Sequence, residues 1–387
     1  MKKLMMAWIL TLAAGSAAAI DFGDDSSLHL TGFYDLTGAK VISGSALGSS
    51  APWTYQQWQC PCTIQGWEYA SVYQKSEGWE FDQESLLGLQ VKKDFTSTFS
   101  ATAQLVMRAN NPNHGSRPTV DWAYATWQPS EDSAWTFQAG QFRIPLYYYS
   151  DYLYIGYAYP WVRPMPDVYG WPIYAYQGAN VTYRTQLGAS DWAATFHVWA
   201  GGYTQNNDAY DTLIYYTTPT NESWKHMIGS YVAANNGIFD VRGMMMWYRD
   251  TTWQDTPSGR VTLIDNEGTR IMGLSANMDY KGWLVKSEVD RYEQIDAGNG
   301  LNNIYKYALV GVGYQWKAWT PMYTFSRYRT VTEPIEGRNT QYLSLRWDFH
   351  KNTALKLQYD VSKDHSQYAY PFFGDSKLIS ISLQGIF

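Results

Sequence analysis

Hydrophobic and polar residues alternate along most of this chain, in short segments that run from one end to the other. Segment 377–387 shows the pattern, with one apolar face and one polar face. Its apolar positions are Ile379, Ile381, Leu383 and Phe387, and its polar positions are Ser380, Ser382 and Gln384. A period of two residues is that of a β-strand. Because the sequence offers no helix or second sheet to cover the apolar faces, we expect lipid to cover them.

Sixteen segments of this kind are predicted to be strands. They are 28–40, 85–94, 97–108, 120–128, 134–142, 173–185, 191–201, 225–235, 238–250, 269–280, 283–293, 305–316, 319–330, 340–349, 353–363 and 377–387. Short connections alternate with long ones along the chain. The short ones are 94–96, 129–133, 186–190, 236–237, 281–282, 317–318 and 350–352. The pattern predicts an all-β fold, a transmembrane antiparallel up-and-down β-barrel with short periplasmic turns and long extracellular loops.

The first 19 residues have the organisation of a secretory signal peptide. Lys2 and Lys3 form the charged region, and the apolar run 4–14 is shorter than the roughly 20 residues that a spanning helix needs. Ala17-Ala18-Ala19 is a small-residue cleavage site. We therefore expect residues 1–19 to be a signal peptide and residues 20–387 to form one outer-membrane barrel domain.

Charge and aromatic content support this assignment. Loss of Lys2 and Lys3 from 29 basic residues, set against 35 acidic residues, leaves a net charge of −8, which argues against nucleic acid as a partner. Aromatic residues make up 17% of the chain and gather beside the short turns, as in the aromatic girdle of a membrane interface. They are Trp127, Trp135, Trp192, Phe239, Tyr280, Trp283, Trp316, Trp319, Phe349 and Phe387. Aromatic β-propensity in a secreted sandwich does not explain why they gather at one end of the strands.

Charged residues share the polar faces of the predicted strands. A charge facing lipid would cost about 2–4 kcal/mol at mid-membrane, so we place these residues in the lumen. They are Lys92, Arg108, Arg184, Arg242, Lys286, Arg346 and Lys356, with Asp121, Asp240, Glu288, Asp290, Asp348 and Asp360. Sixteen strands enclose a lumen too wide for side chains to fill, which predicts an aqueous channel. The near balance of sign leaves open weak ion selectivity or a segregated arrangement with a transverse field.

The connection after the fifth predicted strand, 143–172, is long and rich in tyrosine and proline. It contains Tyr149-Ser-Asp-Tyr152 and Gly156-Tyr-Ala-Tyr-Pro-Trp161. With these features, the strand pattern and the terminal Phe387, the chain resembles the sixteen-stranded, commonly trimeric porins of Gram-negative outer membranes. In that family the third extracellular loop, also after the fifth strand, folds into the barrel and sets its narrowest point. The chain lacks the acidic Pro-Glu-Phe-Gly-Gly signature of enterobacterial porins, and Gly385 stands where such final strands often carry Tyr.

The resemblance implies that 143–172 is a constriction loop in a multi-pass protein of the Gram-negative outer membrane. The implied partners are outer-membrane lipid and lipopolysaccharide, two further copies in a homotrimer, and small hydrophilic solutes. The residues expected to line the constriction are Arg108, Arg143, Asp151, Arg163, Asp167, Arg242 and Arg346. They would set the field and the width of the pore, and none would do chemistry. The loop tyrosines either pack the loop against the wall or offer their faces to sugars or aromatic solutes.

Cysteine and histidine are the two further residue types that could carry chemistry in this chain. Cys60 and Cys62 lie on an oxidising route, where a disulfide that staples the loop is one reading and a reactive or metal-binding pair is the other. The 6 histidines show no metal-ligand spacing. We expect neither a cofactor nor a metal.

The expected function is an outer-membrane porin for passive diffusion of small hydrophilic solutes or ions, and not an enzyme. A porin selective for sugars or aromatic solutes is the alternative. A barrel enzyme of the phospholipase or protease type would need a nucleophile or acid pair with a positioned histidine, and Ser362 and His365 are near each other only through composition. A barrel that sheaths an electron carrier, or a surface receptor, would have more strands or a plug domain.

Overall fold

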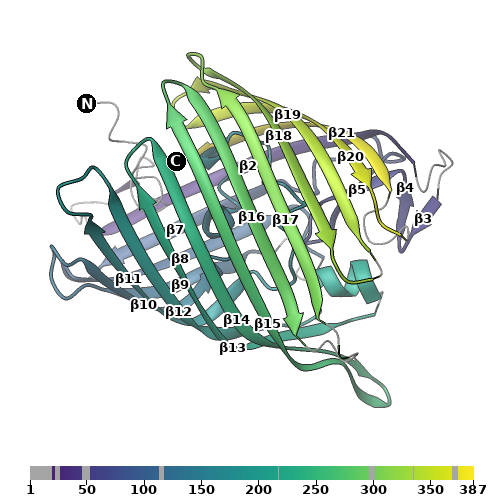
Figure 1. Cartoon of the computed structure of the whole chain (residues 1–387), viewed down its shortest axis with the longest axis horizontal. Coiled ribbons are helices and arrows are strands. Elements are labelled where there is room, and N and C mark those ends of the chain that lie inside the picture. Colours follow the sequence, from purple (N-terminus) through teal and green to yellow (C-terminus); the bar gives the residue numbers. More distant parts are fainter. Residues whose placement is uncertain are drawn as a thin grey trace.

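The protein is described by a computed structural model that places residues 20–21, 27–45, 53–112, 117–216, 218–295, 300, 302–333, 335–367 and 374–387. Sixteen long antiparallel strands of these residues form one closed barrel (Figure 1). Each strand pairs with the next along the chain, and the last pairs with the first through Phe33 and Ile386. The predicted signal peptide, 1–19, lies outside the described residues.

All sixteen predicted strands are confirmed, in the predicted order. They are β2 (Leu28–Ser45), β7 (Leu86–Asp94), β8 (Phe99–Arg108), β9 (Thr119–Trp127), β10 (Trp135–Arg143), β11 (Ala175–Gln186), β12 (Ala193–Gln205), β13 (Asn221–Asn235), β14 (Phe239–Thr256), β15 (Gly259–Tyr280), β16 (Trp283–Ile295), β17 (Asn303–Tyr314), β18 (Trp319–Thr330), β19 (Gly337–His350), β20 (Thr353–Asp364) and β21 (Asp375–Ile386). A two-residue strand, β1 (Ile20–Asp21), extends the ladder beside β2. No helix among the described residues combines the length and the apolar composition that crossing a bilayer requires.

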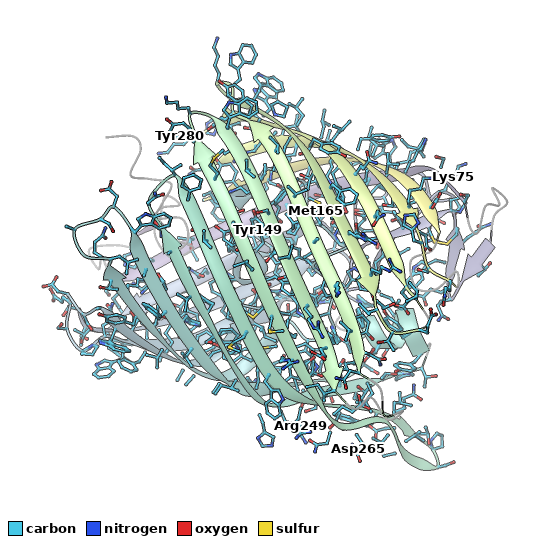
Figure 2. The ribbon with its side chains drawn as sticks, viewed as in Figure 1. Lys75, Tyr149, Met165, Arg249, Asp265 and Tyr280 are labelled. Atoms are coloured by element: carbon cyan, nitrogen blue, oxygen red, sulfur yellow. A yellow bond between two sulfur atoms is a disulfide. The ribbon has the colours of Figure 1, made fainter. Side chains whose placement is uncertain are left out.

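One predicted long connection, between the strands 238–250 and 269–280, was wrong. Residues 251–268 do not form a loop, because β14 and β15 continue their pairing as far as Thr256 and Gly259. The resulting hairpin projects beyond the rim of the barrel (Figure 1), and Figure 2 labels Arg249 and Asp265 near it. Polar residues are in the majority in this extension, and its few apolar residues, such as Trp253, Val261 and Leu263, do not form the continuous apolar face that marks a membrane-crossing strand in the sequence.

The two faces of the strands differ as predicted. In β21, the inward Ser380, Ser382 and Gln384 are completely buried, whereas Ile379 faces outward and is 37% exposed. In β20, Lys356 is buried in the interior while the neighbouring Leu357 lies on the outer surface. Lumen-facing polar groups are therefore shielded from water by other parts of the chain, which shows that the interior of the barrel is occupied.

Large aromatic side chains are exposed at the short-turn end of the barrel. They include Trp127, Trp135, Phe239, Tyr280, Trp283, Trp316 and Phe349. Figure 2 shows side chains of this group around Tyr280, at the tip of the β15–β16 turn. Their position on the outer surface agrees with the predicted girdle.

The first long connection, between β2 and β7, contains its own small strands. β3 (Trp53–Tyr55) pairs with β4 (Trp58–Cys60), and β5 (Cys62–Gly66) pairs with β6 (Ser71–Gln74). Cys60 and Cys62 form a disulfide, so the stapled-loop reading of these residues is the one that the structure supports.

Candidate functional site

The segment 144–174, between β10 and β11, folds into the barrel and crosses its lumen; we call it the crossing loop. Its two ends meet where the amide of Ile144 donates to the carbonyl of Tyr174, at 2.9 Å. Its middle reaches the opposite wall, where Gln384 of β21 donates to the carbonyl of Val162 at 2.7 Å. It carries two short 3₁₀ helices, η1 (Ser150–Tyr152) and η2 (Gly156–Ala158). The loop therefore lies inside the barrel, as the resemblance implied.

Aromatic rings form the body of the crossing loop. Tyr147 and Tyr149 are buried, and their rings meet Trp171 and Trp161 edge to face, at centroid distances of 4.9 and 5.3 Å. Edge-to-face pairs of this kind add about 0.5–1.5 kcal/mol each beyond the area that they bury. Figure 2 labels Tyr149 within the outline of the barrel. All four rings are buried and pack the body of the loop.

Basic side chains on β19 and β20 hold the middle of the crossing loop, at the wall opposite its two ends. The Lys356 ammonium donates to the carbonyls of Gly156, Tyr159 and Trp161, at 2.6, 2.6 and 2.7 Å. Arg346 donates to the carbonyl of Tyr159 at 3.0 Å and also pairs with Asp348. These carbonyls belong to no strand ladder, so the two basic groups supply the hydrogen bonds that buried backbone requires.

The near end of the crossing loop is held by Arg143 and Arg108. Arg143 forms ion pairs with Asp121 at 2.9 Å and with Glu68, of the first long connection, at 3.1 Å. The ring of Tyr154 lies between the two guanidinium groups, 4.2 Å from that of Arg143 and 5.0 Å from that of Arg108. Cation–π contacts in a buried setting stabilise such an arrangement.

Two charged residues within the loop itself bind the wall. Arg163 pairs with Glu84 at 2.5 Å and with Asp360 of β20 at 3.5 Å. Asp167 forms a fully buried ion pair with Arg338 of β19. Breaking one partner of a buried pair costs about 3–5 kcal/mol, because the other charge stays behind without compensation.

Arg242 and Asp151 complete the set of predicted constriction residues. Arg242 of β14 donates to the carbonyl of Pro145 at 2.7 Å, lies 4.0 Å from the centroid of Tyr231, and is 3.8 Å from the Asp151 carboxylate. Each of the seven predicted residues thus belongs to the crossing loop or contacts it directly. Their contacts hold the loop in place, and their role as the charged lining of a pore stays a prediction.

The sequence prediction of the constriction missed several charged residues that hold the crossing loop. They are Glu68, Glu84, Glu288, Arg338 and Lys356. Glu288 and Lys356 were assigned to the lumen from strand alternation, but nothing in the sequence distinguishes them from the other inward charges. Glu68 and Glu84 lie in an irregular connection, where no period shows which way a side chain points.

A cavity of about 310 Å³ lies beside the crossing loop, at the long-loop end of the barrel. Aromatic rings and carboxylates line it. They include Trp67, Trp171, Tyr210, Tyr305, Tyr307 and Tyr328, with Asp211, Glu222, Asp250 and Glu336. Within the described part of the chain, the lining contains no Lys or Arg side chain. The cavity is therefore acidic and aromatic, in contrast with the paired charges that hold the loop.

Two carboxyl groups of loops at this cavity have raised pKa values. Burial raises the pKa of Asp211 to about 6. Burial also raises the pKa of Glu336 to about 7, helped by the nearby Asp364 and opposed by a hydrogen bond from the Tyr328 hydroxyl, at 3.0 Å. Glu336 consequently changes its charge close to neutral pH.

The fold and the inward loop together define the class of protein: a transmembrane β-barrel with the architecture of the outer-membrane porins. No protein-family model matches the sequence, and no curated protein matches it. Solved structures share the fold. OmpF of Salmonella typhi, in complex with daunomycin, is 10% identical with a TM-score of 0.59, over 93% of this chain and 97% of that one.

Two further structures have the same architecture. The anion-selective porin from Comamonas acidovorans is 14% identical with a TM-score of 0.56, over 94% of this chain and 100% of that one. The outer membrane channel DcaP of Acinetobacter baumannii is 9% identical with a TM-score of 0.54, over 93% and 97%. Identities this low show the shared fold alone.

Proposed function

We propose that this protein is a porin of the Gram-negative outer membrane, through which small hydrophilic solutes or ions diffuse passively. The observation that carries the proposal is a closed sixteen-stranded barrel, apolar outside and polar inside, whose lumen is crossed by 144–174. A barrel of this size encloses a space that side chains of the wall alone cannot fill. The crossing loop narrows that space, so it selects solutes by width and by fixed charge.

A porin selective for sugars or aromatic solutes is the second candidate. The acidic, aromatic cavity supports it, because rings such as Tyr305 and Tyr328 line a space that a small solute can enter. Tyr147, Tyr149 and Tyr159 of the crossing loop do not support it, since they are buried. Competition between a sugar or aromatic solute and the ion current distinguishes this candidate from a general porin.

We propose no catalytic role. The charged groups of the lumen with the shortest contacts, such as Arg163 and Lys356, are engaged in holding the crossing loop. The Ser362 hydroxyl bonds to that of Thr340, at 3.1 Å, within the strand ladder. These contacts support a structural role for Arg163, Lys356 and Ser362.

A homotrimer in outer-membrane lipid and lipopolysaccharide fits one face of the barrel. Five alanines lie opposite one another on successive strands from β8 to β12, and we call them the alanine row: Ala101, Ala125, Ala139, Ala179 and Ala200. Gln141 and Gln177 bond to each other on the same side, at 3.1 Å. Small side chains let a neighbouring surface approach closely, and polar ones are costly against lipid. Both features favour a second copy at this face.

Single-channel current of the purified protein in planar bilayers, under a salt gradient, tests the proposed function. Stepwise insertions with near-ohmic conductance are expected, and the reversal potential then reports the sign of the selectivity. Insertion without current would overturn the channel proposal. The crossing loop would then act as a plug, and an enzyme or a receptor would become the better reading.

A further inference from the structure

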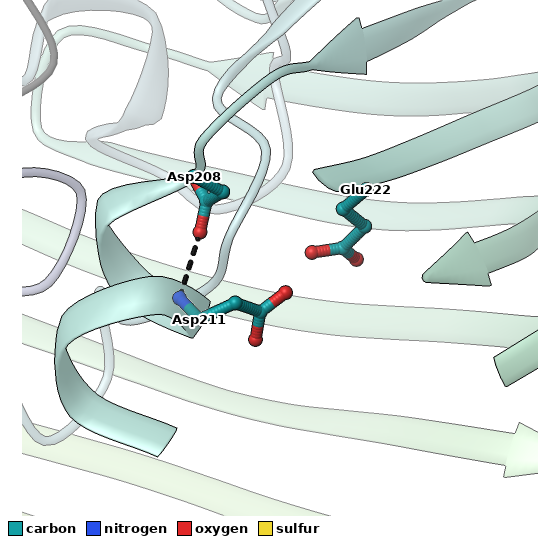
Figure 3. A group of neighbouring side chains, drawn as sticks. All are labelled: Asp208, Asp211 and Glu222. Atoms are coloured by element: carbon teal, nitrogen blue, oxygen red, sulfur yellow. Dashed lines mark hydrogen bonds between the residues drawn. The ribbon is translucent and has the colours of Figure 1, made fainter. Parts of the chain in front are cut away.

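Three buried carboxylates converge at the edge of the cavity. Asp208 and Asp211 come from the connection between β12 and β13, and Glu222 is the second residue of β13. One carboxylate oxygen of each lies within 4.8 Å of the others, and all three side chains are buried. Figure 3 shows them turned toward a common space.

A fourth carboxylate, from a different strand, lies beside one of these three. Asp250 of β14 pairs across the ladder with Trp224, and its carboxyl lies next to that of Glu222. Asp250 and Glu222 are both 2% exposed. Among the described residues, no donor reaches Oδ1 of Asp250 or Oε2 of Glu222. Buried carboxylate oxygens are normally paired or bound to a metal, so these two indicate an additional cation.

The local framework holds the carboxylates in place. The indole Nε1 of Trp224 donates to Oε1 of Glu222 at 2.6 Å, which leaves Oε2 directed elsewhere. Asp208 accepts a hydrogen bond from the amide of Asp211 at 2.9 Å, and its own amide donates to the carbonyl of Thr220 at 2.8 Å. Turn capping alone accounts for Asp208. It does not account for the burial of Glu222 and Asp250 beside it.

We propose that Asp208, Asp211, Glu222 and Asp250 form a binding site for a divalent cation of the Ca²⁺ type. All the donors are carboxylate oxygens, which are the ligands of hard cations. They come from a loop and two strands, and Ca²⁺ accepts irregular sets of six to eight oxygens whereas Mg²⁺ demands a near-ideal octahedron. The bound ion ties the short helix η3 (Tyr210–Tyr216) to the barrel wall at the mouth of the cavity.

The site goes beyond the proposed function, because it stands whether or not the barrel conducts. Its failure and the failure of the channel proposal are separate results: metal binding is measured on the detergent-solubilised protein, and conductance is measured in bilayers.

Terbium(III), which replaces Ca²⁺ at oxygen sites, is the probe for the test. Trp224 touches Glu222 and stacks on Tyr248 at 3.9 Å, so ultraviolet excitation of these rings should sensitise the luminescence of a bound ion. The full chain is treated with chelator, titrated with terbium, and then titrated with Ca²⁺ or Mg²⁺ as competitor. We expect saturable luminescence that Ca²⁺ displaces at a lower concentration than Mg²⁺.

Variants D211N and E222Q each remove one charged ligand with little change in volume. We expect at least a roughly tenfold loss of terbium and Ca²⁺ affinity in each, since affinity depends on the number of charged ligands. D265N is the matched control, because Asp265 is an exposed acid on the neighbouring β15 and should leave the affinity unchanged. Far-ultraviolet circular dichroism identifies any variant that fails to fold.

Absence of saturable luminescence in the folded wild-type chain would overturn the site. Equal affinity in D211N, E222Q and the wild type would overturn it as well, because the ion would then lie elsewhere. A thermal midpoint that rises with Ca²⁺ in the wild type and in D265N, but not in E222Q, would support it independently of luminescence.

Discussion

Lys356 shows how a single buried side chain organises this interior. Its ammonium is the common donor to three carbonyls of the crossing loop, and no water reaches it. A buried ammonium is costly unless it is fully bonded, and three hydrogen bonds are the maximum that it can donate. The residue therefore anchors the loop, and its loss should change the conductance of the pore.

We predict that K356M raises single-channel conductance and lowers thermal stability. Methionine has a similar length but donates no hydrogen bond. The carbonyl of Trp161 then loses its hydrogen bond, at about 1–3 kcal/mol, and the carbonyls of Gly156 and Tyr159 each lose one of two. Conductance in planar bilayers and the thermal midpoint in detergent measure the two effects. K351M, in an exposed short turn, serves as control and should match the wild type. Unchanged conductance in K356M would show that the loop keeps its place without this anchor.

Glu336 predicts a pH dependence of ion selectivity. Burial is the main reason why its pKa is raised to about 7, so the carboxyl is mostly neutral below that pH and charged above it. Preference for cations should increase as the pH rises through about 7, and the reversal potential under a salt gradient measures it. Because this pKa is raised in the folded state, protonated Glu336 contributes to the free energy of unfolding at low pH. That contribution is lost as the pH rises through about 7.

E336Q should abolish this titration, while E333Q should retain it because Glu333 is exposed in the same connection. The charged and ionisable groups that face Glu336 are Tyr328, Tyr305 and Asp364. A tyrosine hydroxyl ordinarily has a pKa of about 10, so neither ring is expected to change its charge near pH 7. A flat reversal potential in the wild type between mildly acidic and mildly basic pH would refute the prediction.

At the scale of elements, ion pairs hold the crossing loop beside its start, through Arg143, and in its middle, through Arg163. Arg143 and Arg163 each join the wall and the first long connection to the loop. The loop is therefore part of a network that includes two other segments, and it should not move independently of them. Its charges determine both where it lies and what field it produces.

Neutralising both arginines, as R143Q/R163Q, should shift the preference of the channel toward cations. The paired carboxylates Glu68, Asp121, Glu84 and Asp360 would keep their charge without a partner, which adds negative field and loosens the loop. Reversal potential and conductance report the two effects together. R143K/R163K keeps the charge and separates field from geometry. An unchanged reversal potential in the glutamine variant would remove the loop from the selectivity argument.

The whole molecule presents two kinds of outer surface. Most outward positions carry large apolar side chains such as Leu274 and Leu343, whereas the alanine row is nearly flat. A flat surface loses little by leaving lipid and gains close contact with a second copy. This contrast is what directs the trimer proposal to one face of the barrel.

We predict that A139W and A179W convert the proposed trimer to monomer in mild detergent. A large ring in the alanine row would separate the facing surfaces while leaving each barrel folded. Native electrophoresis and chemical cross-linking measure the oligomeric state. L274W places the same ring on the other kind of outer surface and should remain trimeric. Trimers that persist in both alanine variants would exclude this face as the interface.

The sequence by itself determined the barrel: sixteen strands, their order, and their inward and outward faces. The segment that enters the lumen was predicted through the resemblance to porins. Strand alternation is a local property, because successive side chains point to opposite faces whatever the strand pairs with. Alternation did not predict the β14–β15 extension, where Trp253, Val261 and Leu263 are few among many polar residues. It also had no way to separate Lys356 from the other inward charges.

Only the tertiary structure decided which charges meet. Arg143 and Glu68 are 75 residues apart, and Asp167 and Arg338 are 171 apart. The cluster at Glu222 draws carboxylates from a loop and from two neighbouring strands, and neither histidine nor cysteine spacing points to it. Closure of the barrel and the path of the crossing loop bring these groups together. Those are long-range pairings, and the local period of a strand contains no information about them.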